Sequence, residues 1–511
     1  MLGGRVKVFS PVSLLWPILL FAGTASGLAA SVLWGVHHRW WRVATSGLLA
    51  VVLGIGGGLA VANIRFDYYR TWGDLLLGPH GRDVAPKGSS LDQLLALAPQ
   101  VAPQATASDG VRRGPAIPSP TISISPKARR LVAGAVRDGH GLLIAVNIPG
   151  PASHIRTRGA WLYLPAAYFE VPARPSFPVL ELLHGVPGGP GTWLTVLHVQ
   201  DDLDRLIAAR QMPPAIVIMP TDNPSRLRSQ ECEDSALALD ETYLTTDVRT
   251  WAAQTLPRAS RGRWGVGGYS TGGFCSYLML LHHPQDYAAA AGVDGYYHAI
   301  DTLFARGLYR SSSERLADSP DWLWQHAPPT VPVQMLIMQG TRDEDYGHAQ
   351  AFRRELLALR PPNLTFVSID NPGAEHTARS WRTFDPLLVA WLARAVTTNS
   401  ASPHQPRATF APLPLGTLAI SPLSSGPDLL VTTRAAAGRR TAAACSPPTP
   451  RRTRRLTGRA GASRAPDPRR SPRDAPAHAS PRPSRGTASS AGARPVAPPT
   501  ACRSARSPGA R

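Results

Sequence analysis

The sequence of 511 residues has few cysteines and lacks the common nucleotide-binding glycine patterns. Its four cysteines do not show the Cys/His spacing of a zinc site, and they are too few for a small disulfide-rich scaffold. Neither a Walker motif nor a dinucleotide-binding glycine motif occurs. We therefore expect no metal ion and no nucleotide cofactor.

The C-terminal segment 398–511 lacks lysine and glutamate altogether. It contains 19 arginines and only three aspartates, so it carries most of the net charge of +20. Alanine, arginine, proline and serine dominate the segment, which cannot bury enough apolar surface to offset the entropy of ordering it. We predict a disordered tail over 398–511 and, because the charge is concentrated in it, no specific nucleic-acid partner.

Two N-terminal segments, 11–35 and 43–64, contain no charged residue. As helices rising 1.5 Å per residue, each would exceed the hydrocarbon thickness of about 30 Å. The short basic stretch VHHRWWR lies between them, with two tryptophans at the expected interface. We predict a membrane hairpin within 1–70. In the alternative, 11–35 is a signal peptide and 43–64 is a buried or interfacial helix.

A linker and a catalytic core are expected after the hairpin. Residues 71–128 are rich in Pro, Gly, Ser and Ala without periodicity, apart from a helix-prone stretch at 91–97, and predict a flexible tether. Over 129–397, short apolar runs alternate with helix-like stretches. The runs are 160–164, 179–183, 215–219, 264–268, 288–293, 333–338 and 364–369. This alternation predicts an α/β domain with a mainly parallel central sheet and helices on both faces.

The motif GYSTG at 268–272 is the most specific signal in the core. It follows the strand-like WGVGG and precedes the helix-like GFCSYLMLLHH. A serine on a tight turn from strand to helix is the nucleophile arrangement of α/β-hydrolases. The motif therefore predicts that fold, with Ser270 as the nucleophile.

A serine hydroxyl needs a base and an acid to become reactive, and in this fold they follow in the order acid, then histidine. Asp343 lies in QGTRDEDYG after the run 333–338, and His376 lies in DNPGAEHTARSW after the last run. We expect His376 to take the serine proton and Asp343 to orient the imidazole. Three other acids remain open as alternatives, namely Glu344, Asp345 and Asp294.

An oxyanion hole needs two backbone amides. The amide after the nucleophile, that of Thr271, is the first candidate. The glycine-rich loop in LLHGVPGGPGTW follows an early strand, and we expect Val186 to provide the second amide. His184 in the same loop is expected to be structural.

With these residues assembled, the core resembles the esterase family that includes esterase D, feruloyl and acetyl xylan esterases, and secreted mycolyltransferases. GYSTGG, GTRD and GAEH match the positions of Ser270, Asp343 and His376, and HGVPG resembles the oxyanion loop that supports Val186. The hairpin with its Trp/Arg loop resembles membrane-anchored actinobacterial members of this family. That resemblance implies a catalytic domain outside the cytoplasm, although basic residues on both sides of 11–35 leave charge counting almost balanced.

Cys232 and Cys275 are the two cysteines of the core. Cys232 lies in a long loop whose sequence ECEDSALALDETYLTTD resembles an insertion of that family, and Cys275 lies five residues after the nucleophile. A bridge between them would suit an extracytoplasmic location. The alternative is two buried thiols.

The leading function is hydrolysis of a carboxylic ester through an acyl-serine intermediate, on a small-molecule, lipid or glycan ester of the cell envelope or the exterior. Acyl transfer to a sugar or lipid hydroxyl is the nearest rival, and the motifs are shared by both reactions. A non-catalytic envelope binding protein is a third possibility, against which the intact order of Ser270, Asp343 and His376 argues.

Overall fold

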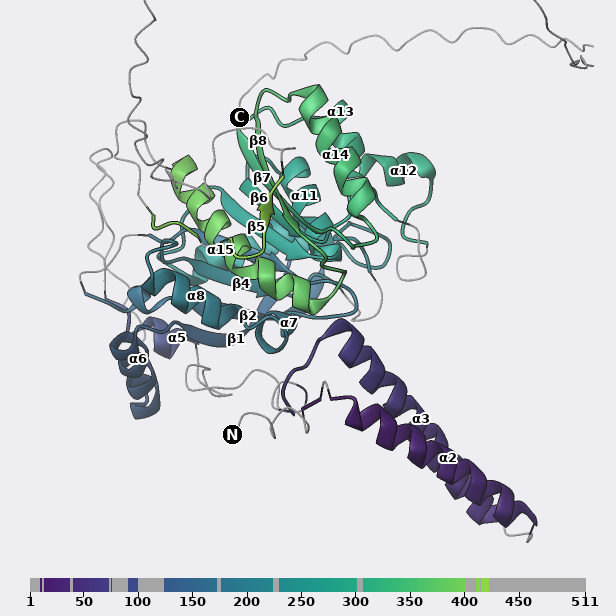
Figure 1. The fold of residues 1–511 in the computed structure, drawn as a ribbon. Helices are drawn as coiled ribbons and strands as arrows, with labels where there is room; N and C mark the ends of the chain where they lie inside the picture. Colours follow the sequence, from purple (N-terminus) through teal and green to yellow (C-terminus); the bar gives the residue numbers. More distant parts are fainter. Residues whose placement is uncertain are drawn as a thin grey trace, which may run out of the picture. The chain divides into compact units, whose positions relative to one another are not determined.

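Two apolar helices come first in the chain, and an α/β domain follows them (Figure 1). The computed structural model describes residues 10–11, 13–36, 40–72, 75, 91–99, 124–171, 176–223, 229–300, 307–400, 410–413 and 415–421. Most of the predicted linker and most of the predicted tail therefore lie outside the described residues.

The α/β domain is built on a nine-stranded sheet with the order β1-β2-β4-β3-β5-β6-β7-β8-β9. Strands β4, β3, β5, β6, β7 and β8 run parallel, whereas β2 is antiparallel to β1 and β4, and β9 is antiparallel to β8. The strands are β1 (Leu142–Gly150), β2 (Ile155–Leu164), β3 (Val179–Leu183), β4 (Ile216–Pro220), β5 (Trp264–Tyr269), β6 (Tyr287–Val293), β7 (Val333–Gly340), β8 (Leu364–Asn371) and β9 (Ala419–Ile420).

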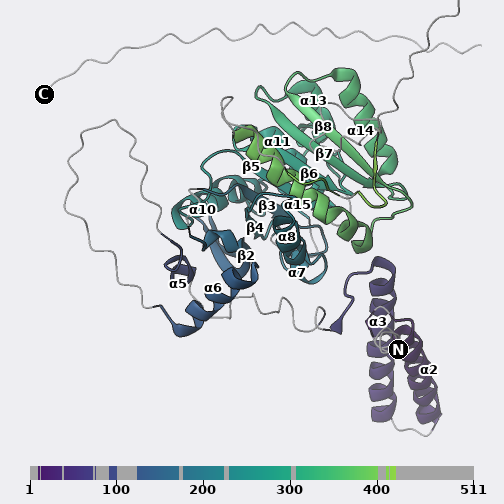
Figure 2. The same ribbon diagram turned by 60° about the vertical axis from the view of Figure 1, so that its left-hand side comes forward.

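Helices cover both faces of this sheet. α8 and α15 lie on one face, and α10, α11 and α14 pack in the hydrophobic cluster of the other face (Figures 1 and 2). The helices of the domain are α5 (Leu91–Leu95), α6 (Pro126–Asp138), α7 (Thr192–Thr195), α8 (Val199–Ala208), α9 (Asp240–Thr242), α10 (Arg249–Thr255), α11 (Thr271–His282), α12 (Ser312–Ala317), α13 (Pro320–His326), α14 (Tyr346–Leu359) and α15 (Ala378–Ser400). A 3-10 turn (Ala166–Tyr168) and a π turn (Tyr243–Val248) complete it. The predicted α/β-hydrolase fold is confirmed.

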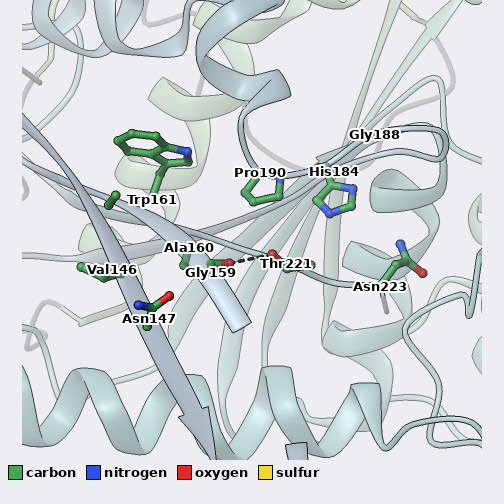
Figure 3. Close-up of a pocket in the computed structure, with 12 residues that line it drawn as sticks. Val146, Asn147, Gly159, Ala160, Trp161, His184, Gly188, Pro190, Thr221 and Asn223 are labelled. Carbon is green, nitrogen blue, oxygen red and sulfur yellow. Dashed lines mark hydrogen bonds between the residues drawn. The ribbon is translucent and has the colours of Figure 1, made fainter. Parts of the chain in front are cut away.

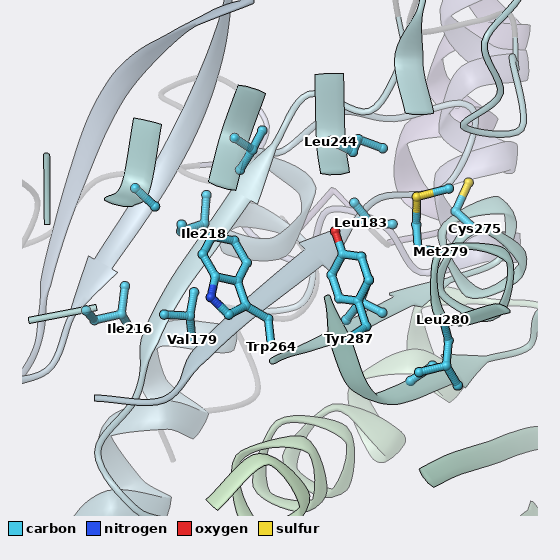
Figure 4. Packing of buried hydrophobic residues seen from close by; sticks show 14 of the residues in the cluster. Val179, Leu183, Ile216, Ile218, Leu244, Trp264, Cys275, Met279, Leu280 and Tyr287 are labelled. Atoms are coloured by element: carbon cyan, nitrogen blue, oxygen red, sulfur yellow. The ribbon is translucent and has the colours of Figure 1, made fainter. Parts of the chain in front are cut away.

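The central strands are buried on both sides, as their continuous apolar runs predict. Figure 4 shows Val179 of β3 and Ile218 of β4 packed with Trp264 of β5 in the cluster that also holds Met279 and Leu280 of α11. This packing fixes α11 against the sheet, and α11 begins directly after Ser270. Ser270, the predicted nucleophile, is therefore held in place by the packing of α11 against the sheet.

The domain extends beyond its predicted limits at both ends. Strand β1 was not among the predicted runs, although its first five residues, LLIAV, are all apolar; only its second half alternates between buried and exposed positions. Leu94, within the predicted linker, is buried in the core. After α15, Leu413 and Leu418 are buried, and β9 pairs with β8, so the predicted boundary at residue 397 is too early.

The hairpin consists of α2 (Leu15–Val36) and α3 (Trp40–Phe66). Both helices are long and apolar enough to cross a membrane, and only 6% and 11% of their most apolar windows are buried within the protein. Trp40 and Trp41, predicted in the connecting loop, instead lie in the first turn of α3. Small residues bring the helices together: the Ser31 and Ser46 hydroxyls are 2.5 Å apart, as favoured between membrane helices.

Charged side chains fasten the end of α3 to the α/β domain. Asp67, only 5% exposed, follows α3, and its carboxylate accepts hydrogen bonds from Arg70 at 2.6 Å and from Arg382 of α15 at 2.9 Å. Arg382 also donates to the carbonyl of Tyr68 at 2.7 Å. Arg65 forms an ion pair with Glu375 at 2.5 Å, and Glu375 directly precedes His376 in the sequence. Because a buried charge such as that of Asp67 needs partners, these contacts attach the end of α3 beside the loop that carries His376.

A disulfide joins Cys232 to Cys275 across a separation of 43 residues, with the Cα atoms 5.7 Å apart. In the chain-entropy account, closing a loop of this length stabilises the fold by about 4 kcal/mol. We expect the double variant Cys232→Ala/Cys275→Ala to lower the free energy of unfolding by roughly that amount in urea titrations. Dithiothreitol should lower the melting temperature of the parent protein but not that of the variant. Equal stability of the two oxidised proteins would contradict this expectation.

Candidate active site

Ser270 lies on a sharp turn between β5 and α11, with φ 55° and ψ −125°. A non-glycine residue in such a conformation costs on the order of 1–3 kcal/mol, which the surrounding packing must offset. The positions of Gly268 and Gly272 leave no room for a larger side chain. A Cβ at Gly268 would lie 2.2 Å from the carbonyl oxygen of Gly272, and one at Gly272 would lie 2.3 Å from that of Leu183. The spacing G-x-S-x-G is therefore a consequence of how closely strand and helix approach.

His376 and Asp343 reach Ser270 from loops that follow β8 and β7. His376 Nε2 lies 3.0 Å from Ser270 Oγ, and His376 Nδ1 lies 2.7 Å from Asp343 Oδ2. The Asp343 carboxylate is buried and also accepts a hydrogen bond from the amide of Asp345 at 2.9 Å. The three predicted residues thus form one hydrogen-bonded series from hydroxyl to carboxylate.

The imidazole of His376 is tuned toward basicity. Burial lowers the pKa of His376, but the hydrogen bond and negative charge of Asp343 outweigh burial, so the pKa lies above its ordinary value of 6.5. The charge of Asp294 adds in the same direction. A more basic imidazole is a better acceptor for the Ser270 proton.

The structure distinguishes Asp343 from the three acids left open by the sequence. Among the described residues, Asp343 is the carboxylate hydrogen-bonded to His376. The Asp294 carboxylate is close, but it accepts a hydrogen bond from the amide of Gly340 at 2.7 Å. Burial and the charge of Asp343 raise the pKa of Asp294 to about 7. Glu344 is exposed, and Asp345 contacts His348 at 3.2 Å.

The predicted oxyanion donors lie on either side of Ser270. Thr271 is the first residue of α11, so its amide has no acceptor within the helix. Val186 lines the same cavity as Ser270. Its loop is held by Asp222, whose carboxylate accepts from the His184 amide at 2.6 Å and lies 2.9 Å from His184 Nε2. Asp222 was missed by the sequence analysis, although its place directly after an apolar run was a usable signal.

Two cavities flank the loop that carries Val186. The first, of about 640 Å³, is called the hairpin cavity; it reaches Ser270, His376 and Val186 and is also lined by residues of α2 and α3. The second, of about 410 Å³, is called the polar cavity. Its lining includes Asn147, Trp161, His184, Asn223 and the loop residues Gly188–Pro190 (Figure 3). The hairpin residues were not predicted as part of the site.

A serine, an imidazole and a carboxylate in hydrogen-bonded sequence, placed at the carboxyl ends of parallel strands, define the class of α/β-fold serine hydrolases. Residues 153–395 match the family described as "Putative esterase". The α/β domain is therefore similar to this esterase family, over just under half of the chain.

Other comparisons match parts of the chain. An uncharacterised protein of Corynebacterium glutamicum is 29% identical over 160 residues; the match covers 30% of this chain and just over a third, 37%, of that relative. FphF, a fluorophosphonate-binding serine hydrolase of Staphylococcus aureus, is 19% identical with a TM-score of 0.42, covering 50% of this chain and 99% of that one. MPT51 of Mycobacterium tuberculosis is 15% identical with a TM-score of 0.38, covering 49% and 97%.

Replacing the two neighbouring aspartates separately provides a matched test of the site. Asp343→Asn should lower kcat/KM for an ester by a factor on the order of 10³–10⁴, because the imidazole loses its orienting carboxylate. Asp294→Asn should cost less than tenfold, since an amide oxygen can still accept from Gly340. Comparable losses in both variants would contradict the assignment of Asp343.

The pH dependence of kcat/KM tests the same contact independently. His376 must be neutral to accept a proton, so activity falls as pH drops through its pKa, which lies above 6.5 in the parent protein. Removing the Asp343 charge removes the contribution that raises this pKa. The acidic limb of the residual activity in Asp343→Asn should therefore move to lower pH.

Proposed function

We propose that the protein hydrolyses carboxylic esters through an acyl-Ser270 intermediate. His376 accepts the proton from Ser270 Oγ as this oxygen bonds to the ester carbonyl carbon. The protonated imidazole then gives its proton to the departing alcohol oxygen as the ester C–O bond breaks. Water repeats the attack on the acyl-enzyme and releases the acid. The distances of 3.0 Å from Ser270 to His376 and 2.7 Å from His376 to Asp343 carry this proposal.

The negative charge on the tetrahedral intermediate needs stabilisation by backbone amides. We assign the amides of Thr271 and Val186 to this role because one begins α11 and the other lies in the loop across the cavity from it. The N-terminus of α11 adds a favourable dipole. One such donor is worth about 3–4 kcal/mol of the barrier.

Acyl transfer is a second candidate, in which a hydroxyl group replaces water in the second step. The polar cavity supports it, because Trp161 and Asn147 offer an aromatic surface and an amide of the kind that orient a hydroxylated molecule. Gly188–Pro190 of the loop line this cavity, while Val186 and Pro187 line the hairpin cavity. A purely binding role is the weakest of the three, since binding alone does not require a hydroxyl, an imidazole and a carboxylate in series.

We place the protein in a membrane with its α/β domain outside the cytoplasm. The low burial of α2 and α3 supports a hairpin in lipid over two core helices of a soluble domain. The Cys232–Cys275 disulfide supports an oxidising compartment.

Replacement of the nucleophile tests the enzyme proposal. The full chain in detergent should hydrolyse 4-nitrophenyl acetate, and Ser270→Ala should lose at least a thousandfold in kcat/KM because no acyl-enzyme can form. A fluorophosphonate probe should label the parent protein at Ser270 and leave the variant unlabelled. Equal hydrolysis by the two proteins would exclude Ser270 from the reaction.

Product analysis separates hydrolysis from transfer. With a nitrophenyl ester and a large excess of a sugar acceptor, a hydrolase should release free acid in nearly the same amount as nitrophenol. A transferase should instead release nitrophenol in excess of free acid, with the difference recovered as acylated sugar in mass spectra. An excess of nitrophenol over free acid would show that a hydroxyl acceptor takes the place of water in the second step.

A further inference from the structure

The hairpin cavity joins the reacting groups to the membrane-type helices. Ser270 and His376 lie at its wall together with Trp16 and Leu20 of α2 and with Ala60 of α3. Its volume is about 640 Å³, which is within the range of pockets that enclose a small organic ligand. A substrate attacked at Ser270 would therefore have part of its structure in contact with the hairpin.

The surface of this cavity is apolar wherever the hairpin forms it. Asn63 is the one amide side chain in its lining, and both ends of that amide are engaged. Its Nδ2 donates to the carbonyl of Tyr69 at 3.0 Å, and its Oδ1 accepts from the amide of Tyr69 at 2.8 Å. The hairpin side of the cavity thus suits a hydrocarbon and offers little to a sugar or a charged group.

The cavity also communicates with the outer surface of the hairpin. Leu59 lines the cavity and is nevertheless 66% exposed. Residues with such exposure on α2 and α3 would contact lipid in a bilayer. A hydrocarbon chain in the bilayer could therefore contact Leu59, which also lines the cavity.

The position of the hairpin relative to Ser270 is held by the contacts of Arg382 with Asp67 and of Arg65 with Glu375. These pairs lie at the end of α3 and beside His376, so the hydrocarbon wall is fixed next to the catalytic loop.

We propose that the substrate is a membrane lipid ester whose long acyl chain occupies the hairpin cavity while its ester carbonyl meets Ser270. The proposal rests on the proposed esterase function and names its substrate class. Attack by Ser270 Oγ forms the acyl–oxygen bond, breaks the bond to the lipid alcohol, and moves the serine proton through His376 to that alcohol.

Filling the cavity should change the preference for chain length. The full chain in lipid nanodiscs is assayed with 4-nitrophenyl acetate and 4-nitrophenyl dodecanoate, and the ratio of the two kcat/KM values is measured. Ala60→Phe should lower the dodecanoate-to-acetate ratio at least tenfold. The matched control Val52→Phe adds the same side chain to α3 at a position that is 56% exposed and does not line the cavity, so its ratio should match the parent. An unchanged ratio in Ala60→Phe would overturn the proposal.

A covalent probe tests the unaltered protein. A fluorophosphonate with a dodecyl chain ending in a diazirine is reacted with the full chain in nanodiscs, illuminated and mapped by peptide mass spectrometry. Crosslinks from Ser270 to peptides of 15–36 or 40–66 are expected. Labelling of Ser270 with crosslinks confined to 124–400 would overturn the lipid proposal and leave the esterase intact. Absence of any labelling at Ser270 would instead overturn the proposed function itself.

Discussion

The backbone of Ser270 is held at a positive φ of 55°, and this conformation depends on the packing of the sheet and helices around it. Gly268 and Gly272 let the turn close, while buried residues of β5 and α11 keep it from relaxing. In this backbone conformation the Ser270 hydroxyl points away from the edge of the sheet and toward the loop that carries His376. The apolar core thus influences Ser270 Oγ only by fixing its position, since apolar side chains take no part in proton transfer.

The same edge of the sheet also holds two buried carboxylates next to His376. Asp343 and Asp294 are both buried, and one carboxylate oxygen of each lies within 4.8 Å of the other and of one ring nitrogen of His376. Burial and, after it, the charge of Asp343 raise the pKa of Asp294 to about 7.

Sequence alone indicated the nucleophile, because the motif around Ser270 is local and its flanking strand and helix are continuous in the chain. It favoured Asp343 as the acid but left Asp294 open, since both follow parallel strands that end at one edge of the sheet. Strand β1 was missed although it begins with the apolar residues LLIAV; its second half, an edge strand with alternating exposed residues, lacks such a run. The attachment of the hairpin was invisible as well, because Asp67 and Arg382 are 315 residues apart and neither lies in a recognisable pattern.

The contacts between the end of α3 and the α/β domain hold the predicted membrane hairpin and the predicted catalytic residues together. In a bilayer, they would hold the mouth of the site at one depth and one orientation relative to the lipid. Encounters would then take place by lateral diffusion in a plane, so turnover would follow the surface density of the ester and depend little on how much of it is dissolved in water.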